Sequence, residues 1–426
     1  MTVPAISPRR RDEVLAALRR GTVPAHGLDV LAVGLDRLVP GFDDDLTAVA
    51  TGGAAFKAVR GEYGAGKTFA TRWLAERAKA RGMATTEVQI SESETPLHRL
   101  ETVYRRACDR LQTSEHPPSA VRPVLDAWLF ALETESGNAG VVLEQRLGDV
   151  ATSAPPFAAA LRGYYRAMMD GDLPTAEGLA AWLAGQPHVA AGVRRAAGVR
   201  GELDHFGALG FLQGLLRVLR DSGHPGLLLV LDEVETLQRV RGDVREKALN
   251  ALRQLVDEVD GGRFPGLYLV ITGTPPFFDG PQGVQRAPAL ASRLATDFRT
   301  DARFDNPRAP QVRLPGFSVD RLVEVGAKVR DVFAHGVAAP ERVLGSVDDA
   351  YLGDLARAVT GSLGGAVGVS PRLFLKKLVA DVLDRVDQFE DFDPRRDYQL
   401  MVRAEEMSDV ERNAAAGRSL DAIDLG

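Results

Sequence analysis

The stretch that decides the fold is Gly61-Glu62-Tyr63-Gly64-Ala65-Gly66-Lys67-Thr68, which matches the pattern G-x-x-x-x-G-K-[ST] in full. Glycines let such a loop wrap so that backbone N–H groups point at phosphate oxygens, and the helix that follows adds the positive end of its dipole. The pattern predicts that Lys67 reaches the β- and γ-phosphates of a nucleoside triphosphate and that the Thr68 hydroxyl ligates Mg²⁺. An ordinary glycine-rich turn is the alternative interpretation. The stretch follows a predicted strand and opens a predicted helix, as a phosphate loop requires.

Outside the loop, short apolar runs alternate with long helical patterns, which predicts an α/β fold with a parallel five-stranded sheet. The run 227–231 is apolar at every position, which is typical of a central strand buried on both faces. The predicted strands are residues 55–60, 85–90, 226–231, 267–272 and 312–317. The predicted helices are residues 67–80, 121–132, 157–169, 176–183, 319–333, 351–359 and 371–386.

These patterns predict four parts of the chain. Residues 1–50 form an N-terminal segment, and residues 51–315 form the core, with a helical insertion at about 111–203. Residues 316–403 are expected to form a helical lid domain. The tail, residues 404–426, is polar and alanine-rich, and we expect it to be loosely ordered.

Two carboxylates follow the third predicted strand, in Leu231-Asp232-Glu233. Ligands of a parallel sheet bind at the carboxyl ends of its strands. We therefore expect Asp232 to hold Mg²⁺ through water and Glu233 to polarise the water that attacks the γ-phosphate. The alternative is an acidic turn that caps the next helix. Glu235 is a weaker candidate and is expected to be a solvated or pairing residue.

The fourth predicted strand ends in Thr272-Gly273-Thr274, and either threonine could lie beside the γ-phosphate. Arginines that face phosphate complete the predicted site. Arg293 and Arg299 follow the fourth strand, where an arginine could reach the nucleotide of a neighbouring subunit. Arg372 lies near the start of a helix in the lid and could reach the nucleotide of its own chain. An ordinary surface ion pair is the alternative for each.

Composition narrows the class of protein. The chain has 426 residues and a formal charge of −6, so an evenly basic coat for nucleic acid is not expected. Cys108 is the only cysteine, which excludes an intrachain disulfide and a cysteine-built zinc site. No apolar run approaches the roughly 18 residues of a membrane helix, and no apolar signal segment follows Arg9–Arg11. A cytoplasmic protein without a membrane partner is expected.

The order of these motifs resembles the AAA+ ATPases, and especially their origin-recognition and signalling relatives. The segments 59–69, 226–235 and 266–278 look more closely like the ATP-binding proteins of bacteriophage-exclusion (BREX) defence clusters. The resemblance implies ATP and Mg²⁺ as cofactors, an oligomer assembled in ATP, and a helicase or other defence proteins as partners. DNA would be bound directly or through those partners. The stretch Ile6–Gly34 resembles the family's adenine-side segment.

The motifs and the resemblance leave three candidate functions. The first is an Mg²⁺-dependent ATPase that powers or gates a DNA-processing defence assembly, and the Glu233 carboxylate favours it. The second is a slow switch whose bound nucleotide controls the recruitment of partners. The third is a DNA-bound initiator or regulator, although no winged-helix module is recognisable after the lid.

Overall fold

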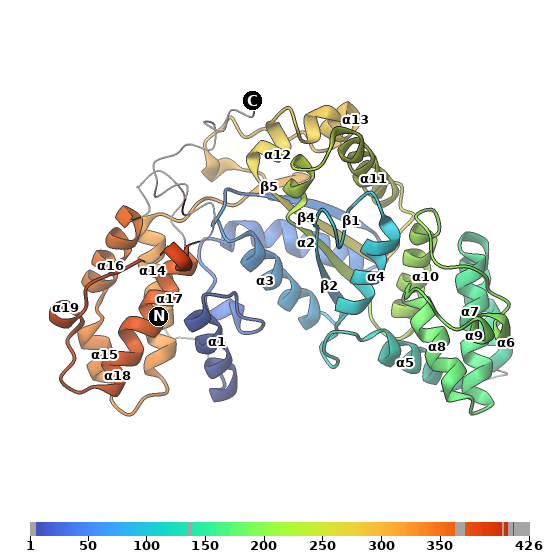
Figure 1. Ribbon diagram of the computed structural model, residues 1–426, viewed down its shortest axis with the longest axis horizontal. Coiled ribbons are helices and arrows are strands. Elements are labelled where there is room, and N and C mark those ends of the chain that lie inside the picture. The colour runs from blue at the N-terminus through green and yellow to red at the C-terminus, as the bar shows by residue number, and fades with distance from the viewer. Residues whose placement is uncertain (1–5, 135–138, 363–370, 403, 408–411, 413–426) are drawn as a thin grey trace. The chain divides into compact units, whose positions relative to one another are not determined.

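The computed structural model describes residues 6–134, 139–362, 371–402, 404–407 and 412 (Figure 1). The chain forms two compact units. The first unit comprises Met1–Val39, Arg60–Glu76 and Arg313–Gly426. The second unit comprises Pro40–Val59 and Arg77–Val312. None of the helices in the described part of the chain is long and apolar enough to cross a bilayer.

The sheet has five strands in the order β2-β3-β4-β1-β5. The strands are β1 (Ala55–Arg60), β2 (Ala84–Gln89), β3 (Leu227–Asp232), β4 (Leu267–Gly273) and β5 (Gln311–Arg313). β3 pairs in parallel with β2 and with β4, and every residue of β3 and β4 is buried. The predicted α/β class and five-stranded sheet are confirmed. β3, which carries the all-apolar run, is an interior strand of the sheet and is buried on both faces, as its sequence predicts.

The fifth strand is shorter than the predicted 312–317. β5 begins at Gln311 and ends at Arg313, after which the Leu314 N–H donates to the Arg60 carbonyl at 2.8 Å. Pro315 follows and has no N–H to donate, so the ladder cannot continue through it.

The second unit surrounds most of the sheet with helices, and its hydrophobic core extends without a break into the predicted insertion. The Phe211 ring lies at the centre of this extension, with its centroid 5.8 Å from Tyr104, 5.1 Å from Phe157 and 5.1 Å from Trp182. Helices α5 to α9 gather beside α10 at one end of this unit (Figure 1). The helices are α2 (Val39–Ala50), α3 (Lys67–Ala80, shared with the first unit), α4 (Leu100–Arg110), α5 (Val121–Thr134), α6 (Ala139–Ser153), α7 (Pro155–Met169), α8 (Leu173–Leu183), α9 (Ala191–Ala196), α10 (Gly207–Asp221), α11 (Gly242–Asp260), α12 (Pro275–Asp279) and α13 (Pro288–Arg293).

The first unit has its own core, which combines the N-terminal helix with the C-terminal helices. The predicted helix 371–386 is a continuous helical stretch that includes a π-helical segment, Lys377–Leu383. Arg19 joins this stretch to α1 through two hydrogen bonds to the Asp384 carboxylate, both of 2.7 Å. The helices are α1 (Pro8–Arg20), α14 (Val319–Ala334), α15 (Pro340–Ser346), α16 (Asp349–Ser362), α17 (Pro371–Lys376), α18 (Asp384–Gln388) and α19 (Pro394–Asp397).

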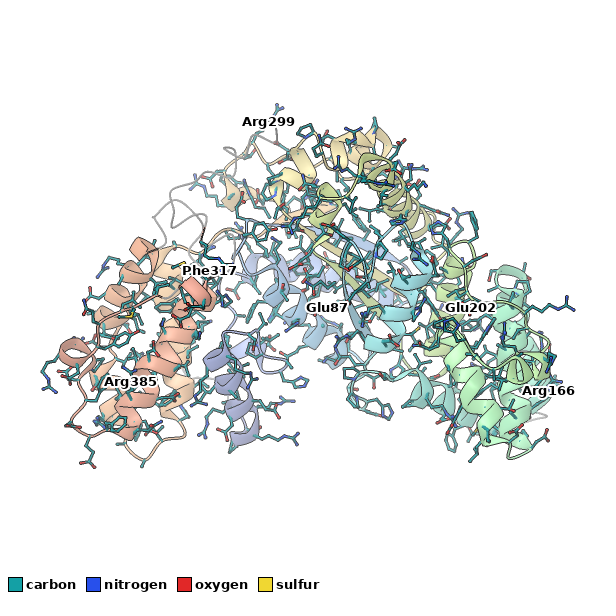
Figure 2. The ribbon with its side chains drawn as sticks, in the orientation of Figure 1. Glu87, Arg166, Glu202, Arg299, Phe317 and Arg385 are labelled. Atoms are coloured by element: carbon teal, nitrogen blue, oxygen red, sulfur yellow. The ribbon has the colours of Figure 1, made fainter. Side chains whose placement is uncertain are left out.

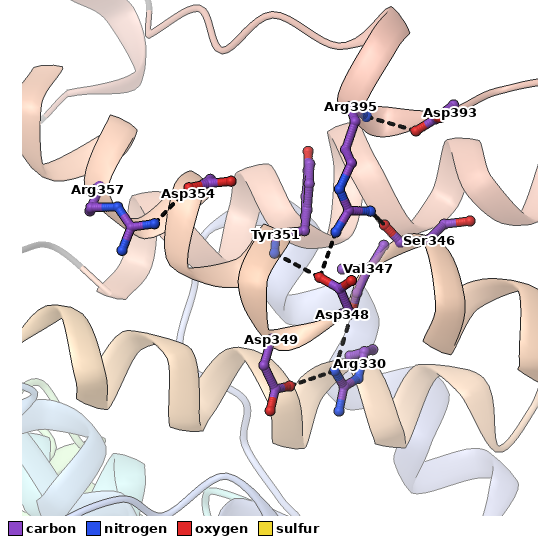
Figure 3. Close-up of polar contacts among 10 residues, drawn as sticks. All are labelled: Arg330, Ser346, Val347, Asp348, Asp349, Tyr351, Asp354, Arg357, Asp393 and Arg395. Carbon is purple, nitrogen blue, oxygen red and sulfur yellow. Dashed lines mark hydrogen bonds and ion pairs between the residues drawn. The ribbon is translucent and has the colours of Figure 1, made fainter.

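Polar contacts centred on Asp348 fasten α16 to α19 at the surface of the first unit (Figure 3). The Asp348 carboxylate accepts the Tyr351 N–H at 2.8 Å and an Arg395 N–H at 2.6 Å. The backbone hydrogen bond from Tyr351, followed by Arg395, lowers the pKa of Asp348. Arg330 of α14 donates to Asp349 at 2.8 Å, which joins a third helix to the group. The predicted tail lies largely outside the described residues; within it, Ala404–Glu406 form a 3₁₀ turn.

A buried cation in the second unit, Lys57, belongs to strand β1. The Lys57 ammonium is 2% exposed and pairs with Asp45 at 3.1 Å. It also donates to the Pro307 carbonyl at 3.3 Å and the Ala309 carbonyl at 3.0 Å. The Tyr268 hydroxyl donates to Asp45 at 2.8 Å, and burial, followed by the Asp45 charge, raises the pKa of Tyr268. One carboxylate therefore satisfies two buried groups from two neighbouring parts of the unit.

We expect Asp45→Ala to reduce the free energy of unfolding by about 3 kcal/mol, because it leaves the Lys57 charge without its counterion. This value lies at the lower end of the range for removing one partner of a buried ion pair, because two carbonyls still accept hydrogen bonds from Lys57. Urea unfolding followed by tryptophan fluorescence measures it. The matched control is Asp44→Ala, because Asp44 pairs with Arg308 in solvent. Asp44→Ala should reduce the free energy of unfolding by about 0–1 kcal/mol. Equal losses for the two variants would contradict this account of Lys57.

Candidate nucleotide-binding site

The predicted phosphate loop lies between β1 and α3. Gly64 has φ 77° and Gly66 has φ 86°, a left-handed backbone that residues with a Cβ rarely adopt. The Ala65 N–H donates to the Glu62 carbonyl at 3.1 Å, and the first bond of α3 runs from the Ala70 N–H to the Gly66 carbonyl at 2.8 Å. The loop therefore turns tightly and passes directly into the helix, the arrangement in which backbone N–H groups at a helix start bind phosphate.

The Lys67 side chain folds back over this loop. Its ammonium donates to the Gly61 carbonyl at 2.8 Å and to the Glu62 carbonyl at 3.3 Å. The ammonium also lies 5.2 Å from the centroid of the Tyr63 ring. The cation is held inside the loop, where it can meet phosphate oxygens. Thr68, the next residue, lies in the first turn of α3.

Glu76 is a residue of this region that the sequence motifs do not reveal. Its carboxylate accepts the Gly27 N–H at 2.7 Å and the Leu28 N–H at 2.8 Å. One turn earlier on α3, Arg72 donates to the Val23 carbonyl at 3.2 Å. These contacts hold the 22–34 stretch against the helix that begins at the phosphate loop. That position agrees with the expected adenine-side role, which stays a prediction.

The carboxyl end of β3 holds a second set of predicted residues. The Asp232 side chain is 4% exposed and accepts a hydrogen bond from the Thr272 hydroxyl, which is wholly buried. The same hydroxyl accepts the Glu233 N–H at 3.1 Å. Thr272 thus orients both acidic residues at the strand end. Thr274 is also buried, but it directly precedes α12, and its carbonyl accepts the Phe277 N–H at 3.0 Å.

Glu233 adopts an unusual conformation. Its φ is 60°, which is uncommon for a residue with a long side chain and is concentrated at functional sites. The Gln89 amide at the end of β2 donates to the Glu233 carboxylate at 2.8 Å. No sequence motif marks Gln89, and only strand pairing brings it beside Glu233. Glu235, expected to be a solvated or pairing residue, is 5% exposed in the 3₁₀ turn Val234–Gln238, which excludes the solvated alternative.

The predicted arginines have different surroundings. Arg293 ends α13 and forms an ion pair with Asp257 of α11. Arg299 projects into solvent from the loop that follows (Figure 2). Arg372 is half-buried in the first unit, where it donates to the Glu406 carbonyl at 2.7 Å. Residues 368–370 of its motif lie outside the described part of the chain.

The predicted residues therefore form two groups. The first unit contains the phosphate loop and Arg372, and the second contains the remaining candidates, namely Asp232, Glu233, Thr272, Thr274 and Arg293. The donors predicted for Mg²⁺ are a hydroxyl at Thr68 and a carboxylate at Asp232. They fit the oxygen preference of this ion, which binds few protein ligands and keeps water and substrate phosphate. No cluster of three or more His, Cys, Asp or Glu side chains suited to a metal occurs among the described residues.

Comparisons with known proteins find one family model that matches most of the chain and solved structures with low similarity to it. A family model described as "BREX system ATP-binding protein BrxC/D" matches residues 6–402. No curated protein matches the sequence. Among solved structures, the Aeropyrum pernix ORC1 protein in complex with DNA is 13% identical, with a TM-score of 0.36, and the match covers 96% of this chain and 69% of that one. The Aeropyrum pernix ORC2 protein (ADPNP-ADP complexes) is 12% identical, with a TM-score of 0.32, and the match covers 89% and 70%.

We expect Glu76→Ala to weaken ATP binding about tenfold, a loss of roughly 1.4 kcal/mol. The change removes both acceptors that hold the backbone of residues 27 and 28, so the adenine-side segment loses its support. Calorimetric titration with ATP measures the affinity. Inorganic triphosphate has no base, so its affinity for Glu76→Ala should equal its affinity for the unmodified chain.

The matched control is Glu13→Ala, which removes an exposed partner of Arg9 in the same unit and should change neither affinity. An equal loss for ATP and triphosphate would contradict the adenine-side role, because Glu76 would then act through the phosphate loop.

Proposed function

The chain belongs to the family of BREX system ATP-binding proteins BrxC/D, and on this premise we propose that it is an Mg²⁺-dependent ATPase of the AAA+ type. In this proposal, turnover powers or gates a DNA-processing anti-phage assembly in the cytoplasm, with a helicase as partner. The observation that carries the proposal is the end of β3. There the Thr272 hydroxyl bonds to the Asp232 carboxylate and to the Glu233 backbone N–H, which supports the roles proposed for these two acidic residues.

Each residue has a distinct task in the proposed reaction. The loop N–H groups and the Lys67 ammonium bind the β- and γ-phosphates, while Thr68 and Asp232 hold the metal. Bound Mg²⁺ neutralises charge on the phosphate oxygens. The Glu233 carboxylate accepts a proton from water as the water oxygen bonds to the γ-phosphorus and the bond to the β–γ bridging oxygen breaks. ADP leaves with the electron pair of that bond.

Two contacts favour a second candidate, the slow nucleotide-gated switch. The Gln89 amide holds the Glu233 carboxylate, and Asp257 holds Arg293. A carboxylate oxygen that accepts a hydrogen bond from a side-chain amide must leave that donor before it can accept a proton from water. Hydrolysis would therefore be slow until a partner or a neighbouring subunit releases these side chains. The two candidates differ in turnover rate rather than in the binding site.

We expect Glu233→Gln to bind ATP with unchanged affinity and to lower hydrolysis by about 10²–10⁴-fold, the range for loss of a general base. The amide preserves the size of the side chain but does not accept the proton. Phosphate release under single-turnover conditions measures the rate, and titration with ATP measures the affinity.

The companion variant is Lys67→Ala, in which affinity should fall because the cation facing the phosphates is gone. Hydrolysis by Glu233→Gln at the unmodified rate would contradict the proposed base, and tight ATP binding by Lys67→Ala would contradict the proposed loop.

Assembly is the second part of the proposal. We assign Arg293 to the nucleotide of an adjacent subunit in an ATP-dependent homo-oligomer, which requires it to leave Asp257. Arg293 lies at the end of a short helix and its side chain is 40% exposed, which supports this assignment. Arg372 is assigned to the nucleotide of its own chain, since it shares a unit with the phosphate loop.

Mixing two inactive variants tests Arg293. We expect Arg293→Ala and Lys67→Ala each to hydrolyse ATP poorly and their mixture to recover part of the activity. Some interfaces then pair an intact phosphate loop with the intact Arg293 of the Lys67→Ala subunit. Phosphate release measures recovery, and light scattering in saturating ATP measures the mass. A monomeric mass without recovery would contradict the assembly.

A further inference from the structure

A polar pocket of about 530 Å³ opens on the second unit, beside α11. Its volume suits a drug-sized ligand, yet pockets for such ligands have mostly apolar walls. Here Ala251 is the one apolar residue of the ten that line the pocket in the described structure. The hydrogen-bonding side chains include His98, His205, Lys247 and Asn250. The chemistry of the walls favours a hydrated, charged group over a flat apolar one.

The charges in the pocket favour an anion. Its two carboxylates already have basic partners, because Asp257 accepts from Arg253 at 3.2 Å and Glu258 pairs with Arg263. Asp257 also pairs with Arg293. No described carboxylate forms an ion pair with Lys247, and that side chain is exposed. An entering anion would therefore meet an ammonium group with no competing counterion.

The two histidines add polar groups to the same wall. His205 accepts the Leu100 N–H on Nδ1 at 3.3 Å, so its neutral ring carries a proton on Nε2. Burial, followed by the charges of Arg99 and Lys247 and against that of Glu101, lowers the pKa of His98. Two cationic side chains therefore lie near His98, where they could attract an anion.

An exposed aromatic ring stands next to this pocket. Phe206 directly follows His205, and the two rings meet edge to face with centroids 5.4 Å apart. The Phe206 side chain is 88% exposed, the largest value among the exposed large hydrophobic residues of the described chain. Aromatic rings beside a basic groove are the platforms on which proteins stack the bases of single-stranded nucleic acid.

We propose that this pocket binds a backbone phosphate of single-stranded nucleic acid while a neighbouring base stacks on Phe206. The combination of a cationic pocket and an exposed aromatic ring favours single-stranded nucleic acid over other partners. An acidic peptide would use the cation but not the ring, and a duplex keeps its bases inside, where the ring cannot reach them. The site goes beyond the proposed ATPase, since it uses none of the residues assigned to nucleotide.

Binding of a fluorescein-labelled oligothymidylate of about 16 nucleotides to the full chain, without ATP, tests the site by fluorescence anisotropy. We expect Phe206→Ala to weaken binding by about 5- to 150-fold, the range for loss of one stacked base, and Phe206→Tyr to restore it. Lys247→Gln should weaken binding and reduce the slope of log affinity against log salt by about 0.7, the value for one phosphate contact on a single strand.

Matched controls lie outside the pocket. Phe304→Ala removes another exposed ring, and Arg241→Gln removes an exposed charge just before α11; both should bind like the unmodified chain. Lys67→Ala should also bind oligothymidylate like the unmodified chain, and this result would separate the pocket from the phosphate loop. Thermal unfolding measurements check that each variant is folded. If Lys247→Gln fails to fold, Phe206→Ala still tests the proposal.

Four results would overturn the proposal, and the last of them is strong competition by inorganic phosphate. The first is unchanged affinity in Phe206→Ala. The second is competition by polyglutamate as strong as that by unlabelled oligothymidylate, which would indicate an acidic protein partner. The third is tighter binding of duplex than of single strand. Inorganic phosphate should compete only weakly, because it fills the pocket without reaching the ring; strong competition would indicate a site for the free anion.

Discussion

Parallel pairing of β3 with β2 and β4 brings three strand ends to one edge of the sheet, and the chemistry of the second unit depends on that pairing. Gln89 lies in register with Asp232, and Ile271 lies in register with Leu231, so Thr272 comes next to Asp232. A shift of one residue would turn these side chains to opposite faces. The apolar run of β3 does not set this register by itself, because it is buried on both faces and would stay apolar on both faces after such a shift.

The polar groups at this edge also show why the site is built on buried strands. Asp232 is almost wholly buried, and an unpaired carboxylate there would cost several kcal/mol, by the usual estimate for a buried charge. The Thr272 hydroxyl satisfies it, and Glu233 turns into a left-handed conformation immediately afterwards. Rigid strands hold Asp232 in place, while the turn presents Glu233. The Gln89 amide holds the Glu233 carboxylate through a hydrogen bond, and the proposed slow switch depends on this contact.

Helix α11 connects the proposed sites of the second unit. It follows the 3₁₀ turn after Glu233, and its Asp257 both lines the polar pocket and pairs with Arg293. The loop that carries His98 begins where β2 ends, beyond Gln89. The pocket therefore shares elements with the side chains proposed for hydrolysis and for assembly. Nucleic acid bound there would contact the segments that hold Glu233 and Arg293.

The sequence by itself determined the local elements, since their signals are local. Glycines that need a positive φ mark the phosphate loop, an all-apolar run marks β3, and helical periodicity marks α5, α7 and α14. Tertiary structure alone decided which side chains meet. Gln89 meets Glu233 across 144 residues, and Glu76 meets Gly27 across 49. Thr272 rather than Thr274 bonds to Asp232 because strand pairing sets the neighbour. Such contacts join residues far apart in the chain, and no periodicity or motif records them.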